Sequence, residues 1–105
     1  MKLGKAKIMY KEALSAQIEN LKPFTAVEVT YVLYAGSRRL LDKSNVLCLH
    51  EKFFMDALVE LGKLPDDNFL YDYNTHYKMG GIDKENPRVE IYIKEVPPKS
   101  LKDFE

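Results

Sequence analysis

The chain has no tryptophan and one cysteine, Cys48, among its 105 residues. One cysteine excludes an intrachain disulfide and any zinc site built from several cysteines. No apolar run approaches the roughly 20 residues that a membrane-spanning helix needs. The opening residues, MKLGKAKIMYKEAL, scatter charges where a signal peptide would carry an apolar stretch. Together these absences predict a cytoplasmic protein that has no membrane partner.

Net charge is also absent, because 16 basic side chains balance 16 acidic ones. The balance is uneven along the chain, since residues 1–52 carry nine Lys or Arg against five Asp or Glu. Residues 53–105 reverse the ratio, with seven basic side chains against eleven acidic ones. A basic first half suits an acidic polymer and an acidic second half suits cations, although ordinary solvated faces would give the same pattern.

The hydrophobic pattern predicts one domain spanning residues 1–105, since this length allows only a modest core. Five segments with regular periodicity are expected to be helix, strand, helix, strand and strand, in that order: 5–21, 26–35, 43–61, 69–79 and 88–96. GGIDKENP is typical of a turn, and PPKSLKDFE is expected to be a frayed tail. The predicted fold is α+β, a small mixed or antiparallel sheet of three to four strands with two helices packed on it.

The segment 43–61 is apolar around nearly its whole circumference, which predicts a buried central helix. One narrow polar stripe remains, because spacings of seven, four and four return to the same helix face. Glu51 lies off this stripe, which consists of Asn45, Lys52, Asp56 and Glu60.

Candidate functional residues stand at both ends of this helix. Asp42 opens it after Arg38 and Arg39, and Asp66 and Asp67 follow it in the turn PDDN. Helix capping is an alternative role for Asp42, and a solvated turn is an alternative for PDDN. Carboxylates with a nearby lysine and guanidinium groups are also what Mg²⁺-assisted phosphodiester hydrolysis requires, because the metal prefers oxygen ligands and the cations neutralise phosphate charge.

These motifs resemble those of the RusA-type Holliday junction resolvases, small homodimeric nucleases of bacteria and their phages. The resemblance covers residues 38 to 93 and is carried by RRLLDKSN, KFFMDALVELGKLPDDNF and NPRVEIYI. Family members have an arginine-rich loop, an Asp-x-Asp-Asn motif at a helix start, a lysine, an Asp-Ala-Leu and an Asp-Asp turn. Ser44 stands here in place of the second motif aspartate, and the segment before Lys52 is longer by about one helical turn.

The resemblance implies a role for each matching residue. Asp42, Lys52 and Asp67 would be catalytic, and Asp42, Asp66 and Asp67 would hold Mg²⁺ or Mn²⁺. The DNA-binding residues would be Arg38, Arg39 and Asn45.

The function so implied is a homodimeric, metal-dependent endonuclease that resolves Holliday junctions or other branched DNA in recombination, repair or phage DNA processing. Two alternatives stay open. One is a catalytically weak or inactive relative that binds DNA or a protein as a phage accessory factor, which Ser44 and the zero net charge favour. The other is a purely structural phage protein.

Overall fold

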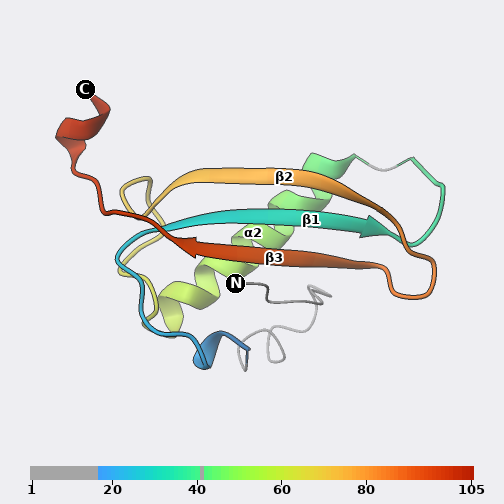
Figure 1. The fold of residues 1–105 in the computed structure, drawn as a ribbon, viewed down its shortest axis with the longest axis horizontal. Coiled ribbons are helices and arrows are strands. Elements are labelled where there is room, and N and C mark those ends of the chain that lie inside the picture. The colour runs from blue at the N-terminus through green and yellow to red at the C-terminus, as the bar shows by residue number, and fades with distance from the viewer. Residues whose placement is uncertain (1–16, 41) are drawn as a thin grey trace.

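The computed structural model describes residues 17–40 and 42–105. Along this part of the chain the order is β1 (Val27–Ala35), α2 (Lys43–Glu60), β2 (Asp72–Ile82), β3 (Arg88–Glu95) and the C-terminal 3-10 helix η1 (Leu101–Phe104). The first expected helix lies mostly outside the described residues, of which 17–19 are helical. The prediction of an α+β fold is confirmed, with a mixed sheet of three strands (Figure 1).

β1 is the central strand, parallel to β2 on one side and antiparallel to β3 on the other. Parallel neighbours need a long crossover connection, and α2 provides it. The turn after β2 then passes the end of β1, where the Asp83 amide donates a hydrogen bond to the Ala35 carbonyl at 2.8 Å. This connection brings the chain to the opposite edge of the sheet, where β3 begins.

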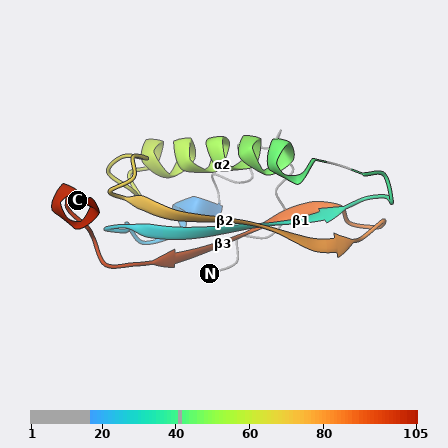
Figure 2. The same ribbon diagram turned by 90° about the horizontal axis from the view of Figure 1, so that it is seen from above.

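The core lies between α2 and one face of the sheet (Figure 2). Strand alternation directs Val29, Tyr31 and Leu33 of β1 into it, as their spacing predicts. The Tyr31 ring packs edge-to-face against Phe54 of α2 and Tyr77 of β2, with centroid separations of 6.1 and 5.9 Å. This aromatic group joins the helix to two strands at the centre of the domain.

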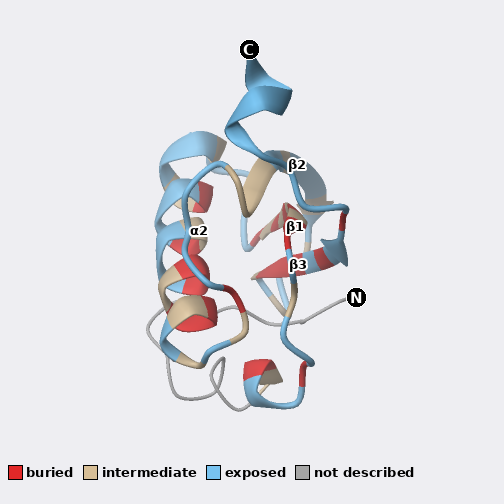
Figure 3. Cartoon of the chain, turned by 90° about the vertical axis from the view of Figure 1, so that its left-hand side faces the viewer, coloured by how far each residue is buried: buried red, intermediate tan, exposed pale blue. Residues whose placement is uncertain are grey.

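The expectation that α2 is buried on all sides is wrong. Leu47, Phe54 and Leu58 face the sheet and are fully buried, whereas Leu49 and Phe53 on the outer side are 47% and 37% exposed (Figure 3). Figures 2 and 3 show α2 as an outer layer on the sheet. A helix in such a layer buries one stripe only, whatever residues occupy its other side.

The glycines of GGIDKENP belong to a strand and not to a turn. β2 continues through them to Ile82, and Leu33 pairs with Met79 while the next residue of β1, Tyr34, pairs with Gly81. Gly80 is therefore the extra residue of a β-bulge. A Cβ atom on Gly80 would lie 2.6 Å from the Tyr34 ring, and Gly81 has a φ of 150° that favours glycine.

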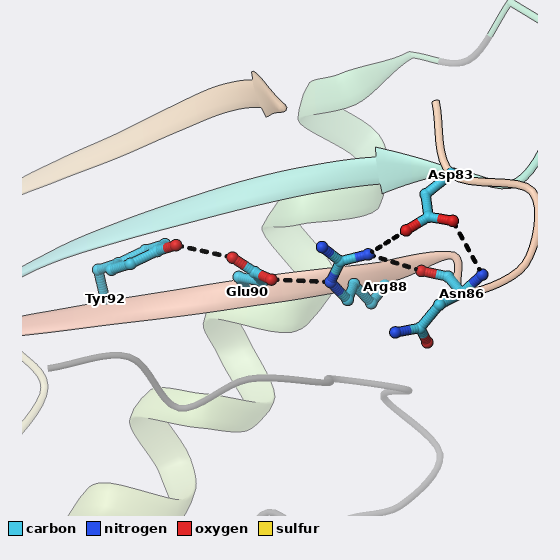
Figure 4. A network of polar contacts seen from close by, with 5 residues as sticks. All are labelled: Asp83, Asn86, Arg88, Glu90 and Tyr92. Atoms are coloured by element: carbon cyan, nitrogen blue, oxygen red, sulfur yellow. Dashed lines mark hydrogen bonds and ion pairs between the residues drawn. The ribbon is translucent and has the colours of Figure 1, made fainter. Parts of the chain in front are cut away.

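A polar network fastens the turn after β2 to β3 (Figure 4). The Arg88 guanidinium donates to the carboxylates of Glu90 and Asp83 at 2.7 and 2.8 Å and to the Asn86 carbonyl at 2.9 Å. The Tyr92 hydroxyl donates to the other oxygen of Glu90 at 2.7 Å. Glu90 is 2% exposed, so these contacts offset the cost of burying its charge.

The C-terminal segment was expected to fray, but it forms η1. The Phe104 ring of η1 packs edge-to-face against Phe69 with a centroid separation of 5.0 Å. The Ser100 amide donates to the Asp103 carboxylate at 2.8 Å and stabilises the start of the turn.

The bulge yields a test of the fold. Gly80→Ala should destabilise the protein by about 1–3 kcal/mol, because the new methyl group meets a ring with little freedom to move. The Arg88 guanidinium lies 4.0 Å from the centroid of the Tyr34 ring and is itself held by Asp83 and Glu90. Urea unfolding measures the change. A smaller loss for Gly80→Ala in a Tyr34→Ala background is expected, and an equal loss in both backgrounds would contradict the steric explanation.

Candidate functional site: an acidic cleft beside the helix

A cleft of about 180 Å³ opens between the middle of α2 and the start of β2. We call it the acidic cleft, and its lining residues are Cys48, Glu51, Lys52, Met55, Asp67 and Asp72. Because α2 is a crossover, the chain that leaves its C-terminal end returns to begin β2 beside it. The loop 61–71 therefore carries Asp67 back alongside helix residues that precede it by more than two turns.

Lys52 and Asp67 are the two predicted catalytic residues that the structure brings together. Local hydrogen bonds shape the loop that carries Asp67. The Asp66 carboxylate accepts the Asp67 amide at 2.8 Å, and the Asn68 side chain accepts the Leu70 amide at 3.0 Å. Asp and Asn favour such turns because their side chains bond to nearby backbone amides. The carboxylate of Asp67 remains exposed at the cleft.

Asp72 lines the cleft, although regular alternation along β2 would turn it to the face opposite Tyr77. The pairing of β1 with β2 shifts by one residue after Val27, which pairs with Asp72 while Glu28 pairs with Asn74. Tyr73 is thus the extra residue at this point, and the irregularity turns Asp72 toward the helix side. Burial raises the pKa of Asp72 to about 6, with the charges of Glu51 and Asp67 raising it further against the Thr75 hydrogen bond, which lowers it.

Glu51 is the second residue that sequence reasoning missed. It lies off the polar stripe of α2, but β2 packs beside that part of the helix. The Tyr77 hydroxyl of β2 donates a hydrogen bond to the Glu51 carboxylate. Burial and then this hydrogen bond raise the pKa of Tyr77 above its ordinary value. The only signal of this contact in the sequence was a tyrosine in the predicted strand and a glutamate in the predicted helix.

Behind this pair lies Tyr31, which is fully buried. Its hydroxyl has no hydrogen-bond partner within residues 17–40 and 42–105. Burial raises the pKa of Tyr31, and the charges of Glu51 and Asp72 raise it further. A buried hydroxyl outside the cleft therefore feels the charge of two of its carboxylates.

Asp42 lies elsewhere, at the N-cap of α2. Its carboxylate accepts the Ser44 amide at 3.0 Å and the Asn45 amide at 3.4 Å, as a capping side chain does. Ten residues of helix separate Asp42 from Lys52, which is about 15 Å along the axis. The structure therefore does not bring Asp42 together with Lys52 and Asp67, and the exposed Asn45 is at the same distant end.

Asp66 takes part in the turn and not in the acidic cleft. Its second carboxylate oxygen accepts the Asn68 side-chain amide at 3.3 Å. Asp66 lines an adjoining pocket of about 260 Å³, which also includes Asp56, Glu60 and Asp67. Of the three carboxylates expected to share one metal ion, Asp66 and Asp67 therefore line this pocket together, and Asp42 lies apart from them at the N-cap of α2.

Arg38 and Arg39 follow β1 and lie with Lys43 at the N-terminal end of α2. These three residues line a pocket of about 380 Å³, which we call the basic pocket. α2 therefore has basic side chains at one end and the acidic cleft toward the other.

Within the described chain, no three His, Cys, Asp or Glu side chains are already grouped to hold a metal ion. Mg²⁺ does not require such a group, because it commonly binds one or two protein carboxylates and completes its shell with waters and substrate phosphate. Asp67 and Asp72 fit that mode, since both line the acidic cleft and supply hard oxygen ligands.

Comparison of the sequence with models of known families and with curated proteins finds no match. None of the helices in the described residues is long and apolar enough to cross a membrane. The resemblance to the RusA-type resolvases accordingly stays a prediction.

The capping geometry predicts what substitutions at Asp42 do. Asp42→Ala should lower the free energy of unfolding by about 1 kcal/mol, because two helix amides lose their acceptor. Asp42→Asn should leave stability nearly unchanged, since asparagine caps about as well. Thermal and urea unfolding of the two variants in parallel measure this, and equal losses would exclude capping as the role of the side chain.

The pKa of Asp72 predicts a dependence of stability on pH. Because the folded pKa of about 6 lies above the unfolded value of 3.8, the protonated carboxyl contributes stability below pH 4 that is lost as pH rises through 6. Asp72→Asn should therefore stabilise the protein at pH 7 by about 1 kcal/mol, an amount reduced for solvent screening of a partly buried group. At pH 4 the difference should nearly vanish. Urea unfolding in EDTA at both pH values tests this, and a pH-independent difference would count against it.

Proposed function

We propose that the protein is a Mg²⁺- or Mn²⁺-dependent endonuclease that cuts branched DNA, with its reaction centre in the acidic cleft. The observation that carries the proposal is that Lys52 and Asp67 line the same cleft. These residues are fifteen positions apart in the chain, were selected for this chemistry from the sequence, and line one cleft with two more carboxylates.

The residues of the acidic cleft would each have a separate role. Asp67 and Asp72 would hold the ion, which when bound supplies Lewis-acid polarisation of the phosphodiester and activation of water. Lys52 would place its ammonium group against the phosphate and offset the charge that builds up there in the transition state. Glu51 is oriented by Tyr77 and supplies the third carboxylate of the cleft.

DNA would reach this cleft only with help, because carboxylates outnumber the single lysine in it. A divalent ion reduces the repulsion, and the basic pocket provides backbone contacts at the other end of α2. Both contributions are electrostatic, so affinity should fall as salt rises and should require the divalent ion.

We propose a homodimer as the active form. Symmetric nicking of a four-way junction needs two equivalent reaction centres, and a twofold axis supplies them. Tyr71, Tyr73 and Tyr77 offer only part of their area to an interface, because all three are half-buried and Tyr77 packs on Tyr31. Light scattering at micromolar concentration distinguishes the dimer from a monomer of 12.2 kDa.

A role in DNA binding without cleavage is the second candidate. It is favoured by the lack of a ready-made group of three metal-binding side chains in the described part of the chain. Such a protein would bind a synthetic four-way junction in Mg²⁺ or Mn²⁺ and leave it intact.

The nuclease proposal is tested by incubating the protein with a synthetic four-way junction and Mg²⁺ or Mn²⁺. Asp67→Asn and Lys52→Met should each lower the cleavage rate by about 100-fold or more, because each removes charge that acts on the transition state. Asp67→Asn should also weaken Mg²⁺ binding in calorimetry, whereas Lys52→Met should not.

Asp42→Asn is the matched control, since it makes the same chemical change at the helix cap. It should cleave at the wild-type rate, because Asp42 lies about 15 Å along α2 from Lys52. Loss of cleavage in Asp42→Asn with full activity in Asp67→Asn would place the reaction centre at the other end of the helix. No cleavage by the wild type with either metal would leave the binding role.

A further inference from the structure

The basic pocket is lined both by cations and by apolar side chains. Arg38, Arg39 and Lys43 are its cations, and we call Leu33, Met79 and Ile82 its apolar lining. Leu33 is nearly buried, but Met79 and Ile82 are 52% and 51% exposed. Large apolar side chains gathered in a pocket and left in contact with solvent indicate a surface that a ligand covers.

The bulge at Gly80 brings two residues of this apolar lining to one face of the strand. Along a regular strand, residues 79 and 82 would point to opposite faces, because side chains alternate. The extra residue corrects the alternation, so Met79 pairs with Leu33 and Ile82 pairs with Ala35 on the same face. Bulges re-aim side chains in this way and are enriched beside functional sites.

Two hydrogen bonds hold the part of the chain that carries the cations. The Lys43 ammonium donates to the Tyr77 carbonyl at 3.3 Å, and the Arg39 amide donates to the Ser37 hydroxyl at 3.2 Å. Of the described residues that line the pocket, three are cations and none is a carboxylate. The nearby carboxylate of Asp42 is engaged with the amides of α2.

From this geometry we infer that the basic pocket binds one unpaired nucleotide, with its phosphate on Arg38, Arg39 and Lys43 and its base on Met79 and Ile82. The inference rests on the proposed function, because it takes the ligand to be part of the DNA substrate. Cations alone would suit any anion, but the apolar lining favours an anion that carries a flat apolar group. A base stacked in a duplex cannot enter such a pocket, so the nucleotide is one that pairing has released.

The size and position of the pocket agree with this ligand. Its volume of about 380 Å³ falls within the range of roughly 300–1,000 Å³ that is typical of small-molecule sites. Lys43 and Lys52 are nine residues apart, or about 14 Å along α2. That separation corresponds to about four nucleotides of a B-form strand, which would fix where the unpaired nucleotide lies relative to the cut.

Thymidine 5′-monophosphate is the probe, added to the full chain in EDTA so that no cleavage can occur. Methyl-labelled NMR spectra should show the Met79 and Ile82 signals shifting as the nucleotide is added, because a base ring lies against both side chains. Thymidine alone and inorganic phosphate should each bind at least about tenfold more weakly, since each keeps only one half of the contacts.

Two variants test the phosphate contacts and the base contacts separately. Arg39→Ala should weaken nucleotide binding by about tenfold, and Ile82→Ser by about threefold without affecting inorganic phosphate. Lys102→Ala and Leu101→Ser in η1 are the matched controls, because both residues are exposed and lie outside the pocket. The NMR shifts of the wild type test the inference even where a variant unfolds.

Phosphate binding as tightly as the nucleotide, with no shift at Met79 or Ile82, would overturn the inference and leave a plain anion site. Equal displacement by an acidic, leucine-rich peptide would also overturn it and identify a protein partner instead. Failure of the proposed function looks different: the nucleotide binds in EDTA, but the wild type cuts no junction in Mg²⁺ or Mn²⁺.

Discussion

The parallel pairing of β1 with β2 is the constraint on which the remaining structure depends. Parallel strands cannot be joined by a tight turn, so the chain must cross the sheet, and α2 makes that crossing. The crossing buries Tyr31 beneath Phe54 and Tyr77 at the centre of the domain. It also forces the loops before and after α2 to opposite ends of the helix. The basic pocket and the acidic cleft are separated for this reason, although residues of α2 line both.

Two irregularities in β2 change which side chains face the two sites. The shift after Val27 turns Asp72 toward the acidic cleft, and the bulge at Gly80 turns Ile82 toward the basic pocket. Each irregularity interrupts the ladder and leaves one residue without a regular partner, which costs stability. Both stand at ends of the strand, where the loss of pairing is smallest. The centre of β2, from Asn74 to Met79, keeps its regular register against β1.

Periodicity in the sequence was enough to predict the fold class, the bounds of β1 and the start and stop of α2. It failed where a single residue changes the phase of a strand, as at Asp72, because alternation counts residues and cannot detect an extra one. It also failed for the outer side of α2. Leu49 and Phe53 suggested burial, yet no second layer covers them in the described part of the chain.

The candidate site was predicted in part for a related reason. Lys52 and Asp67 were found because their residue types suit the chemistry, and the crossover then brought them together. Asp42 suits that chemistry equally well, but its carboxylate is satisfied by two backbone amides of α2. Residue type cannot distinguish a carboxylate that caps a helix from one that faces a cleft. The distinction depends on whether backbone amides already bind the carboxylate, which the structure shows for Asp42.

Apart from its cap, α2 lacks the charges that would stabilise its dipole. Helices are stabilised by acidic residues in the first turn and basic residues in the last, and α2 has neither. Lys43 is instead in the first turn, near Arg38 and Arg39. Carboxylates line the acidic cleft beside the middle of the helix and the adjoining pocket near its C-terminal end. Only the cap at Asp42 complements the dipole at the N-terminal end. The arrangement gives up part of the helix stability and produces a field that is positive at one end and negative toward the other. For the proposed nuclease, that field would hold a phosphate backbone at the basic pocket and concentrate divalent cations at the acidic cleft. The two sites on one helix would then act on the same DNA strand, one by binding its phosphates and the other by supplying the metal ion.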